Sequence, residues 1–211
     1  LALGVELGDG VNAVIEEERD PRNLLLCFKL VAKLLSSYPA SCVSDPALGQ
    51  LFEALVSYFP ITFTPPKDDR VGITGEDLRN GLSGALSATP RFTEQLLPFL
   101  LDQTKDITVG DNEESISQAL ELLAVVLERY GAKVAQQWVE KILSTARDQT
   151  CRTETPCPTQ FADMVRRSLA AALSDVPKGL SPAWISKQVY PGLKTLVEDA
   201  ARGEDSLATE G

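Results

Sequence analysis

The residue types that could do chemistry are few in this sequence, and they are scattered. The chain has no histidine, which removes the commonest general base, the usual partner of a serine or cysteine nucleophile and most zinc sites. Cys151 and Cys157 lie close together on a predicted loop, but Cys27 and Cys42 are far away in the sequence. The four cysteines therefore predict no metal site, and Cys27 falls inside an apolar helical run as a small buried side chain.

Paired carboxylates can act as an acid and a base, and pairs occur at Asp68-Asp69, Glu76-Asp77 and Glu113-Glu114. Each pair lies in a loop or at a predicted helix start, where solvated charge is the simpler explanation. Residues 72–75 (Gly-Ile-Thr-Gly) lack the spacing and the lysine of a phosphate-binding loop. The sequence predicts no catalytic residue, no cofactor and no metal, and so a protein that is not an enzyme.

Composition and charge narrow the function further. The chain has 211 residues, 44% of them hydrophobic, with 30 acidic and 20 basic residues and a formal net charge of −10. An acidic body repels phosphate, and Arg166-Arg167 is too small a basic cluster to offset this, so nucleic-acid binding is not expected. The longest apolar runs are interrupted by charge, which predicts no membrane span.

The first clear helix start is Asp20-Pro21, a capping acid followed by proline. Two apolar stripes follow at helical spacing, with a narrow polar side. The stripes are Leu24, Phe28, Val31 and Leu35, and Leu26, Leu30 and Leu34, and the polar side is Arg22, Lys29 and Lys33. So wide an apolar arc predicts neighbouring elements on two sides of this helix.

Similar signals punctuate the rest of the chain. Asp45-Pro46 and Thr89-Pro90 predict further starts, Thr74 predicts a cap with Asp77 in the first turn, and Gly131 fits a helix stop. After the first of these, the predicted apolar helix face is Leu48, Leu51, Phe52, Leu55, Val56 and Phe59.

The most regular helix precedes Gly131, and its predicted solvent side is Glu114, Glu121 and Glu128. Trp138 lies on the apolar stripe of the next helix, which predicts a core position.

Helices of modest length recur in pairs at a spacing of roughly 40 residues, the period of HEAT-type repeats. The predicted fold is therefore all-α: a right-handed stack of antiparallel helix pairs, or HEAT/ARM-like α-solenoid. One continuous stack is expected over residues 1–202, followed by a disordered tail over residues 203–211 that is polar and small in composition. A compact helical bundle is the competing architecture.

Two features are candidate partner-binding sites. The first is the stiff, apolar loop at residues 58–66, which contains Tyr58, Phe59, Pro60, Ile61, Phe63, Pro65 and Pro66. It is predicted either to pack over neighbouring helices and fix their angle or to offer a rigid ridge to a partner. The second is Trp184, because tryptophan is enriched at binding hot spots.

Three runs together resemble a known family: residues 20–28 (DPRNLLLCF), 51–69 (LFEALVSYFPITFTPPKDD) and 72–103, which includes SATPRF at 87–92. They are similar to the N-terminal domain of the HEAT-repeat scaffold subunit of the cytosolic iron–sulfur cluster targeting complex. That family was first named for nucleotide excision repair and transcription. The second half of the chain resembles it mainly in its helical pattern.

The resemblance implies a non-catalytic scaffold that helps to target iron–sulfur clusters to apoproteins of DNA repair, replication and transcription. The implied partners are other subunits of the complex, bound through other regions of a longer chain, and clients such as helicases and polymerases. The implied location is both cytoplasmic and nuclear. An acidic surface would suit basic partner surfaces.

A second hypothesis stays open. In it, a helical-repeat protein acts directly in nucleotide excision repair and transcription by holding a helicase-containing factor, with no role in cluster delivery.

Overall fold

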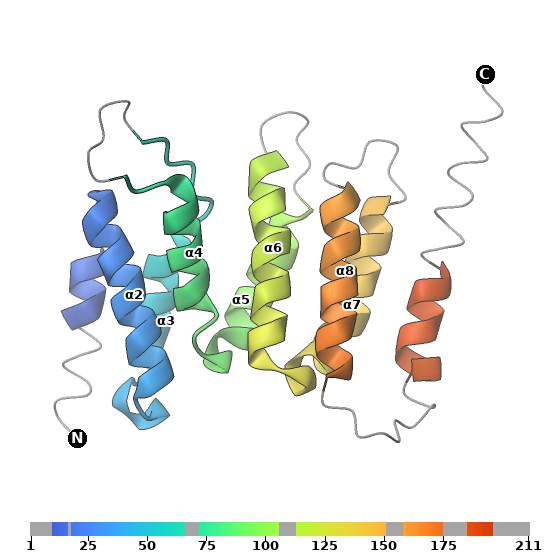
Figure 1. Cartoon of the computed structure of the whole chain (residues 1–211). Helices are drawn as coiled ribbons and strands as arrows, with labels where there is room; N and C mark the ends of the chain where they lie inside the picture. Colours follow the sequence, from blue (N-terminus) through green and yellow to red (C-terminus); the bar gives the residue numbers. More distant parts are fainter. Residues whose placement is uncertain are drawn as a thin grey trace. The chain divides into compact units, whose positions relative to one another are not determined.

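The computed structural model describes residues 10–16, 18–65, 72–105, 113–150, 158–174 and 185–195, and all regular secondary structure in these ranges is helical. The longer helices are α2 (Pro21–Ser37), α3 (Asp45–Val56), α4 (Gly75–Leu86), α5 (Thr93–Gln103), α6 (Glu113–Tyr130), α7 (Ala132–Thr150) and α8 (Pro158–Leu173). The shorter elements are η1 (Ala40–Cys42), η2 (Pro90–Phe92) and the π-helical turn η3 (Ile185–Val189). The predicted all-α, helical-repeat fold class is confirmed (Figure 1).

The chain divides into two compact units, residues 1–94 and residues 95–211. A single continuous stack over residues 1–202, its handedness and the competing bundle stay predictions. The predicted tail at 203–211 lies outside the described residues.

In the first unit, α2 and α4 lie side by side, and α3 runs in the opposite direction behind them (Figure 1). The start of α2 is as predicted, because the Asp20 side chain accepts a hydrogen bond from the main-chain N–H of Arg22 at 2.9 Å. The predicted cap of α4 is also confirmed. Thr74 and Asp77 form a reciprocal capping box in which each side chain binds the other residue's main-chain N–H.

The predicted bounds of α3 need two corrections. Its cap is Ser44, whose hydroxyl accepts from the main-chain N–H of Ala47, so Asp45 is already the first helical residue. The helix also ends at Val56, and Phe59 therefore lies beyond the helix face to which the sequence assigned it. Pro60 explains this early end, because a proline disfavours the helical conformation of the residue before it.

The two-sided packing predicted for α2 is wrong for part of its second stripe. Leu34 is buried, but Leu26 and Leu30 are 63% and 50% exposed. The neighbour α4 packs on the other side of α2, where Gly81 of α4 comes close to Leu25 and Phe28. An outward-facing apolar strip is left on α2.

In the second unit, α6 and α8 lie side by side, and α7 runs antiparallel to both (Figure 1). Gly131 makes the turn from α6 to α7 with φ of +88°, a conformation that favours glycine, and this confirms the predicted stop. The amide of Gln136 on α7 donates to the carbonyl oxygen of Ala172 on α8 at 2.8 Å. Neither unit contains a described helix long and apolar enough to cross a bilayer.

Candidate protein-interaction site

The loop that follows α3 is anchored by Tyr58. Its hydroxyl donates to the carbonyl oxygen of Ile15 at 2.6 Å, and the carbonyl oxygen of Glu18 is also within reach at 3.1 Å. Its ring meets that of Phe28 edge-on, with 5.8 Å between ring centres. Burial raises the pKa of Tyr58 above the ordinary tyrosine value. Tyr58 thus ties the loop to α2 and to the segment that precedes it.

Further along, the loop packs against the first unit. Ile61 is 5% exposed, while Phe59, Pro60 and Phe63 are half-buried. A Cβ atom at Gly75 would lie only 2.6 Å from the carbonyl oxygen of Phe63, so the loop main chain rests directly on the start of α4.

The outer part of the loop differs. Pro65 is exposed, the peptide bond between Phe59 and Pro60 is cis, and Pro66 lies outside the described residues. The described contacts are those of a loop that packs on neighbouring helices. Its use as a binding ridge stays a prediction.

The motif at residues 87–92 also acts within the first unit. The Arg91 guanidinium donates to the carbonyl oxygens of Ala40 (3.1 Å) and Val43 (3.0 Å) and to the carboxylate of Asp45 (2.6 Å). Its neighbour Phe92 is fully buried and packs on Phe52 with 5.5 Å between ring centres. This motif holds the turn between α2 and α3 in place.

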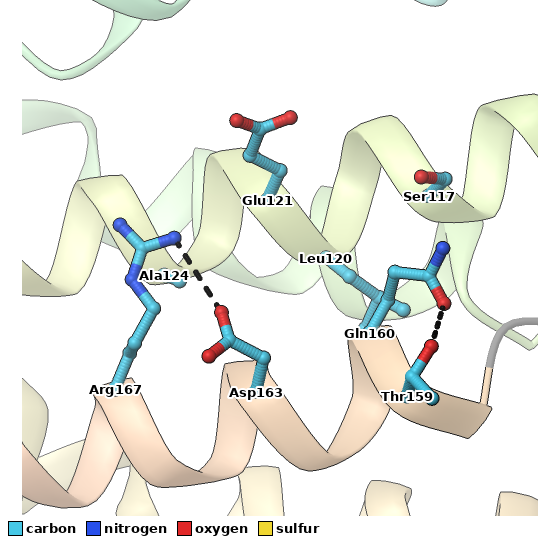
Figure 2. Close-up of a pocket in the computed structure, with 8 residues that line it drawn as sticks. All are labelled: Ser117, Leu120, Glu121, Ala124, Thr159, Gln160, Asp163 and Arg167. Atoms are coloured by element: carbon cyan, nitrogen blue, oxygen red, sulfur yellow. Dashed lines mark hydrogen bonds and ion pairs between the residues drawn. The ribbon is translucent and has the colours of Figure 1, made fainter.

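An open pocket lies between α6 and α8 in the second unit, with a volume of about 330 Å³ (Figure 2). We call it the α6/α8 groove. Its lining residues are Ser117, Leu120, Glu121 and Ala124 from α6 and Thr159, Gln160, Asp163 and Arg167 from α8.

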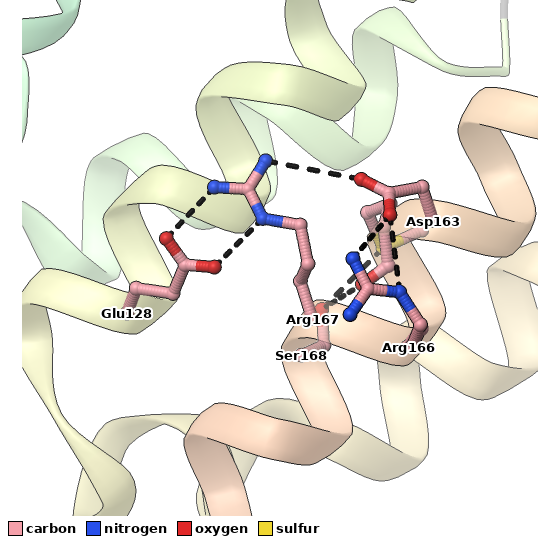
Figure 3. A network of polar contacts seen from close by, with 6 residues as sticks. Glu128, Asp163, Arg166, Arg167 and Ser168 are labelled. Atoms are coloured by element: carbon pink, nitrogen blue, oxygen red, sulfur yellow. Dashed lines mark hydrogen bonds and ion pairs between the residues drawn. The ribbon is translucent and has the colours of Figure 1, made fainter.

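An ion-pair network borders this groove (Figure 3). The Arg167 guanidinium binds both carboxylate oxygens of Glu128 at 2.7 Å and lies 3.9 Å from Asp163, which in turn binds Arg166. The hydrogen bond from Arg167 lowers the pKa of Glu128. The network thus joins α6 to α8 along one edge of the groove.

The unpaired charge of the groove belongs to Glu121. Its side chain is exposed, it forms no ion pair with the described residues, and it stands above the groove in Figure 2. With Asp163 and Arg167 it gives the lining a net charge of −1, beside the hydroxyls of Ser117 and Thr159. These groups can accept hydrogen bonds from a lysine or arginine side chain of a partner.

The sequence analysis missed this groove, although part of the signal was visible. Glu121 and Glu128 were placed on the solvent side of a helix, seven residues apart and so on one face. The contribution of α8 could not be seen, because the pairing of Arg167 with Glu128 joins residues 39 positions apart.

The two tryptophans give different results. Trp138 is half-buried, and the Lys141 ammonium lies 4.9 Å from the centre of its ring, so the predicted core position is only partly met. Trp184 and the cysteines Cys151 and Cys157 lie outside the described residues. Cys27 is buried, as predicted. The described part of the chain contains no group of three or more possible metal ligands.

These features define a class of protein: an all-helical repeat protein whose sequence motifs fix loops between helices and whose surface carries a charged groove. Residues 2–152 match the MMS19 N-terminal family, described as a Dos2-interacting transcription regulator of RNA-Pol-II. The match covers more than half of the chain, and the chain belongs to this family.

Three curated relatives support the same assignment. The MMS19 nucleotide excision repair protein homolog of Mus musculus is 34% identical over 172 residues, which are 82% of this chain and 16% of the mouse protein. Its Dictyostelium discoideum counterpart is 38% identical over 133 residues, or 63% and 11% of the two chains. The Saccharomyces cerevisiae DNA repair/transcription protein MMS19 is 37% identical over 125 residues, or 59% and 12%.

The chain spans about a sixth or less of the length of these relatives. The family resemblance found in the sequence is confirmed.

Proposed function

We propose that this chain is part of a non-catalytic scaffold in cytosolic iron–sulfur protein maturation. In this role it helps to target clusters to apoproteins that act in DNA repair, replication and transcription, in both the cytoplasm and the nucleus. The observation that carries the proposal is family membership over residues 2–152, with relatives named for DNA repair and transcription.

The geometry is compatible with a binding role. Packed helix pairs expose a large surface for their mass, which suits a protein that binds several partners. The α6/α8 groove adds unpaired negative charge at Glu121 on a chain whose formal net charge is −10. Basic client surfaces would be attracted to it.

A second candidate function is favoured by the names of the relatives alone. These link the family to nucleotide excision repair and to transcription. In that case the chain would hold a helicase-containing repair factor directly, without any role in cluster delivery.

A binding panel distinguishes the two. The purified chain is immobilised and offered four purified proteins: an apo helicase and an apo polymerase that take iron–sulfur clusters, an apo iron–sulfur enzyme unrelated to DNA, and a repair helicase that takes no cluster. Capture of all three cluster-taking apoproteins, without the fourth, is expected for a role in maturation.

Capture of the two helicases alone would favour the direct repair role. Equal capture of all four proteins would overturn the proposal. The electrostatic part has its own test, because capture should weaken as salt rises. Capture that is equal at low and high salt would contradict it.

A further inference from the structure

The outward strip of α2 is the least expected surface of the first unit. Leu26 and Leu30 lie one helical turn apart and are 63% and 50% exposed. Two leucines at this spacing form an apolar ridge along the helix. The described residues provide no neighbour that covers it.

The charge beside this ridge is opposite to that of the chain as a whole. Lys29 and Lys33 are exposed on the same outer side of α2 and form no ion pair with the described residues. The helix from Pro21 to Ser37 contains no acidic residue, in a chain with a formal net charge of −10. Arg22 adds a third positive charge, which Asp20 partly offsets through a contact of 2.6 Å.

The nearest negative charge beyond the helix belongs to Asp77. Lys29 helps to lower the pKa of this carboxyl, but the stronger causes are its hydrogen bonds with Thr74. Asp77 is therefore already engaged in the cap of α4, and it leaves the ammonium group of Lys29 available to a partner.

We propose that this surface, the α2 outer face, binds an acidic amphipathic helix of a partner protein. The apolar stripe of that helix would cover Leu26 and Leu30. Its Asp and Glu side chains would pair with Lys29 and Lys33. A helix fits because apolar side chains one turn apart pack into the groove between side chains of a facing helix. The proposal does not depend on a role in cluster delivery.

Other occupants fit the α2 outer face less well. An anionic membrane or a nucleic acid would be repelled by the net charge of −10. Two leucines are also a small apolar area for insertion into a bilayer. A protein helix with its own acidic residues meets both the leucines and the lysines.

The test uses the 211-residue chain and labelled helical peptides of about 18 residues, long enough to form a helix on binding. Each peptide carries one leucine stripe with glutamates elsewhere, and the set moves the glutamates around the helix. A second set has lysine in place of glutamate. Binding is followed by fluorescence anisotropy.

At least one glutamate peptide should bind, and the lysine peptides should not. The double variants Leu26→Asp with Leu30→Asp, and Lys29→Glu with Lys33→Glu, should each weaken binding about tenfold, which corresponds to loss of one or two contacts at the interface. The second variant should also gain binding to a lysine peptide. That reversal is a result that misfolding cannot produce.

Matched controls lie in the second unit. Leu173→Asp replaces another exposed leucine, and Lys133→Glu with Lys187→Glu makes the same charge change elsewhere. These should change binding less than about twofold, since exposed positions away from an interface contribute little.

Several outcomes would overturn the proposal. They are no binding by any glutamate peptide, binding that the α2 variants leave unchanged, and binding of anionic vesicles that these variants abolish. A concentration-dependent dimer that is lost on Leu26→Asp with Leu30→Asp would instead assign the face to a second copy of the chain.

Discussion

The two compact units use their polar side chains differently. In residues 1–94, Tyr58 and Arg91 bind main-chain carbonyl oxygens of nearby loops. In residues 95–211, Glu128 and Arg167 pair on the surface, beside a groove that Glu121 leaves negatively charged. Hydrogen bonds to partly buried main-chain groups stabilise a fold more than exposed ion pairs do. The family-like motifs of the first unit are therefore structural, while the charges of the second unit are open to a partner.

The largest effect is expected for Phe92→Ala in the first unit. Phe92 is fully buried and packs on Phe52. Its truncation removes apolar contacts and leaves a cavity, which typically costs about 3–5 kcal/mol. The free energy of unfolding from urea titration measures this loss.

The exposed aromatic Tyr38, which is 54% exposed, is the control. Tyr38→Ala should cost less than about 0.5 kcal/mol, as surface substitutions usually do. A loss for Tyr38→Ala as large as that for Phe92→Ala would contradict a core located at Phe92.

A smaller effect is expected where the loop after α3 rests on α4. Gly75→Ala places a Cβ atom 2.6 Å from the Phe63 carbonyl oxygen, and main chain can yield only by shifting the loop. Overpacking of this kind costs about 1–3 kcal/mol. Urea unfolding gives the free energy, and near-ultraviolet circular dichroism reports the loop aromatics.

Gly84 lies on the same helix with no atom within 4 Å of its Cβ position. Gly84→Ala should therefore stabilise the unit by about 0.5–1 kcal/mol, because alanine favours the helix. Equal effects of the two substitutions would show that the loop does not rest on Gly75.

The sequence predicted the elements of both units well, because their signals are local. Asp20, Thr74 and Gly131 mark helix ends through contacts within a few residues, and all three are where the patterns placed them. The fate of α2 was harder to predict. Its two apolar stripes look alike in sequence, and only the direction from which α4 approaches decides that Leu26 stays exposed.

The site was less predictable for a similar reason. The loop at 58–65 was recognised from its prolines and aromatics, but its anchor joins Tyr58 to Ile15, 43 residues earlier. The α6/α8 groove needs two helices that the chain brings together only after an intervening helix. Long-range pairing of this kind leaves no pattern in a single sequence.

The next effect concerns the hydroxyl of Tyr58. Tyr58→Phe removes the donor to Ile15, which should cost about 1–2 kcal/mol in a partly buried setting. Because burial raises the folded-state pKa of Tyr58, its contribution is complete below the ordinary tyrosine value of about 10 and is lost as pH rises above it. Unfolding free energies measured from pH 8 to pH 11 should thus converge for the two proteins.

Tyr38→Phe provides the matched control, since Tyr38 is exposed. It should leave both the unfolding free energy and its decline with pH unchanged. A constant difference between the parent chain and Tyr58→Phe up to pH 11 would show that the hydroxyl does not titrate with folding.

The smallest effect should come from the second unit, at the pair of Glu128 and Arg167. Both side chains are partly exposed, at 44% and 22%, so a double-mutant cycle with Glu128→Gln and Arg167→Met should give a coupling of no more than about 1 kcal/mol. Since Arg167 lowers the folded-state pKa of Glu128, this coupling is present above the ordinary glutamate pKa and is lost as pH falls below it. A coupling as large as the effect of Phe92→Ala would erase the contrast between the units, because the surface charges of α6 and α8 would then hold the fold.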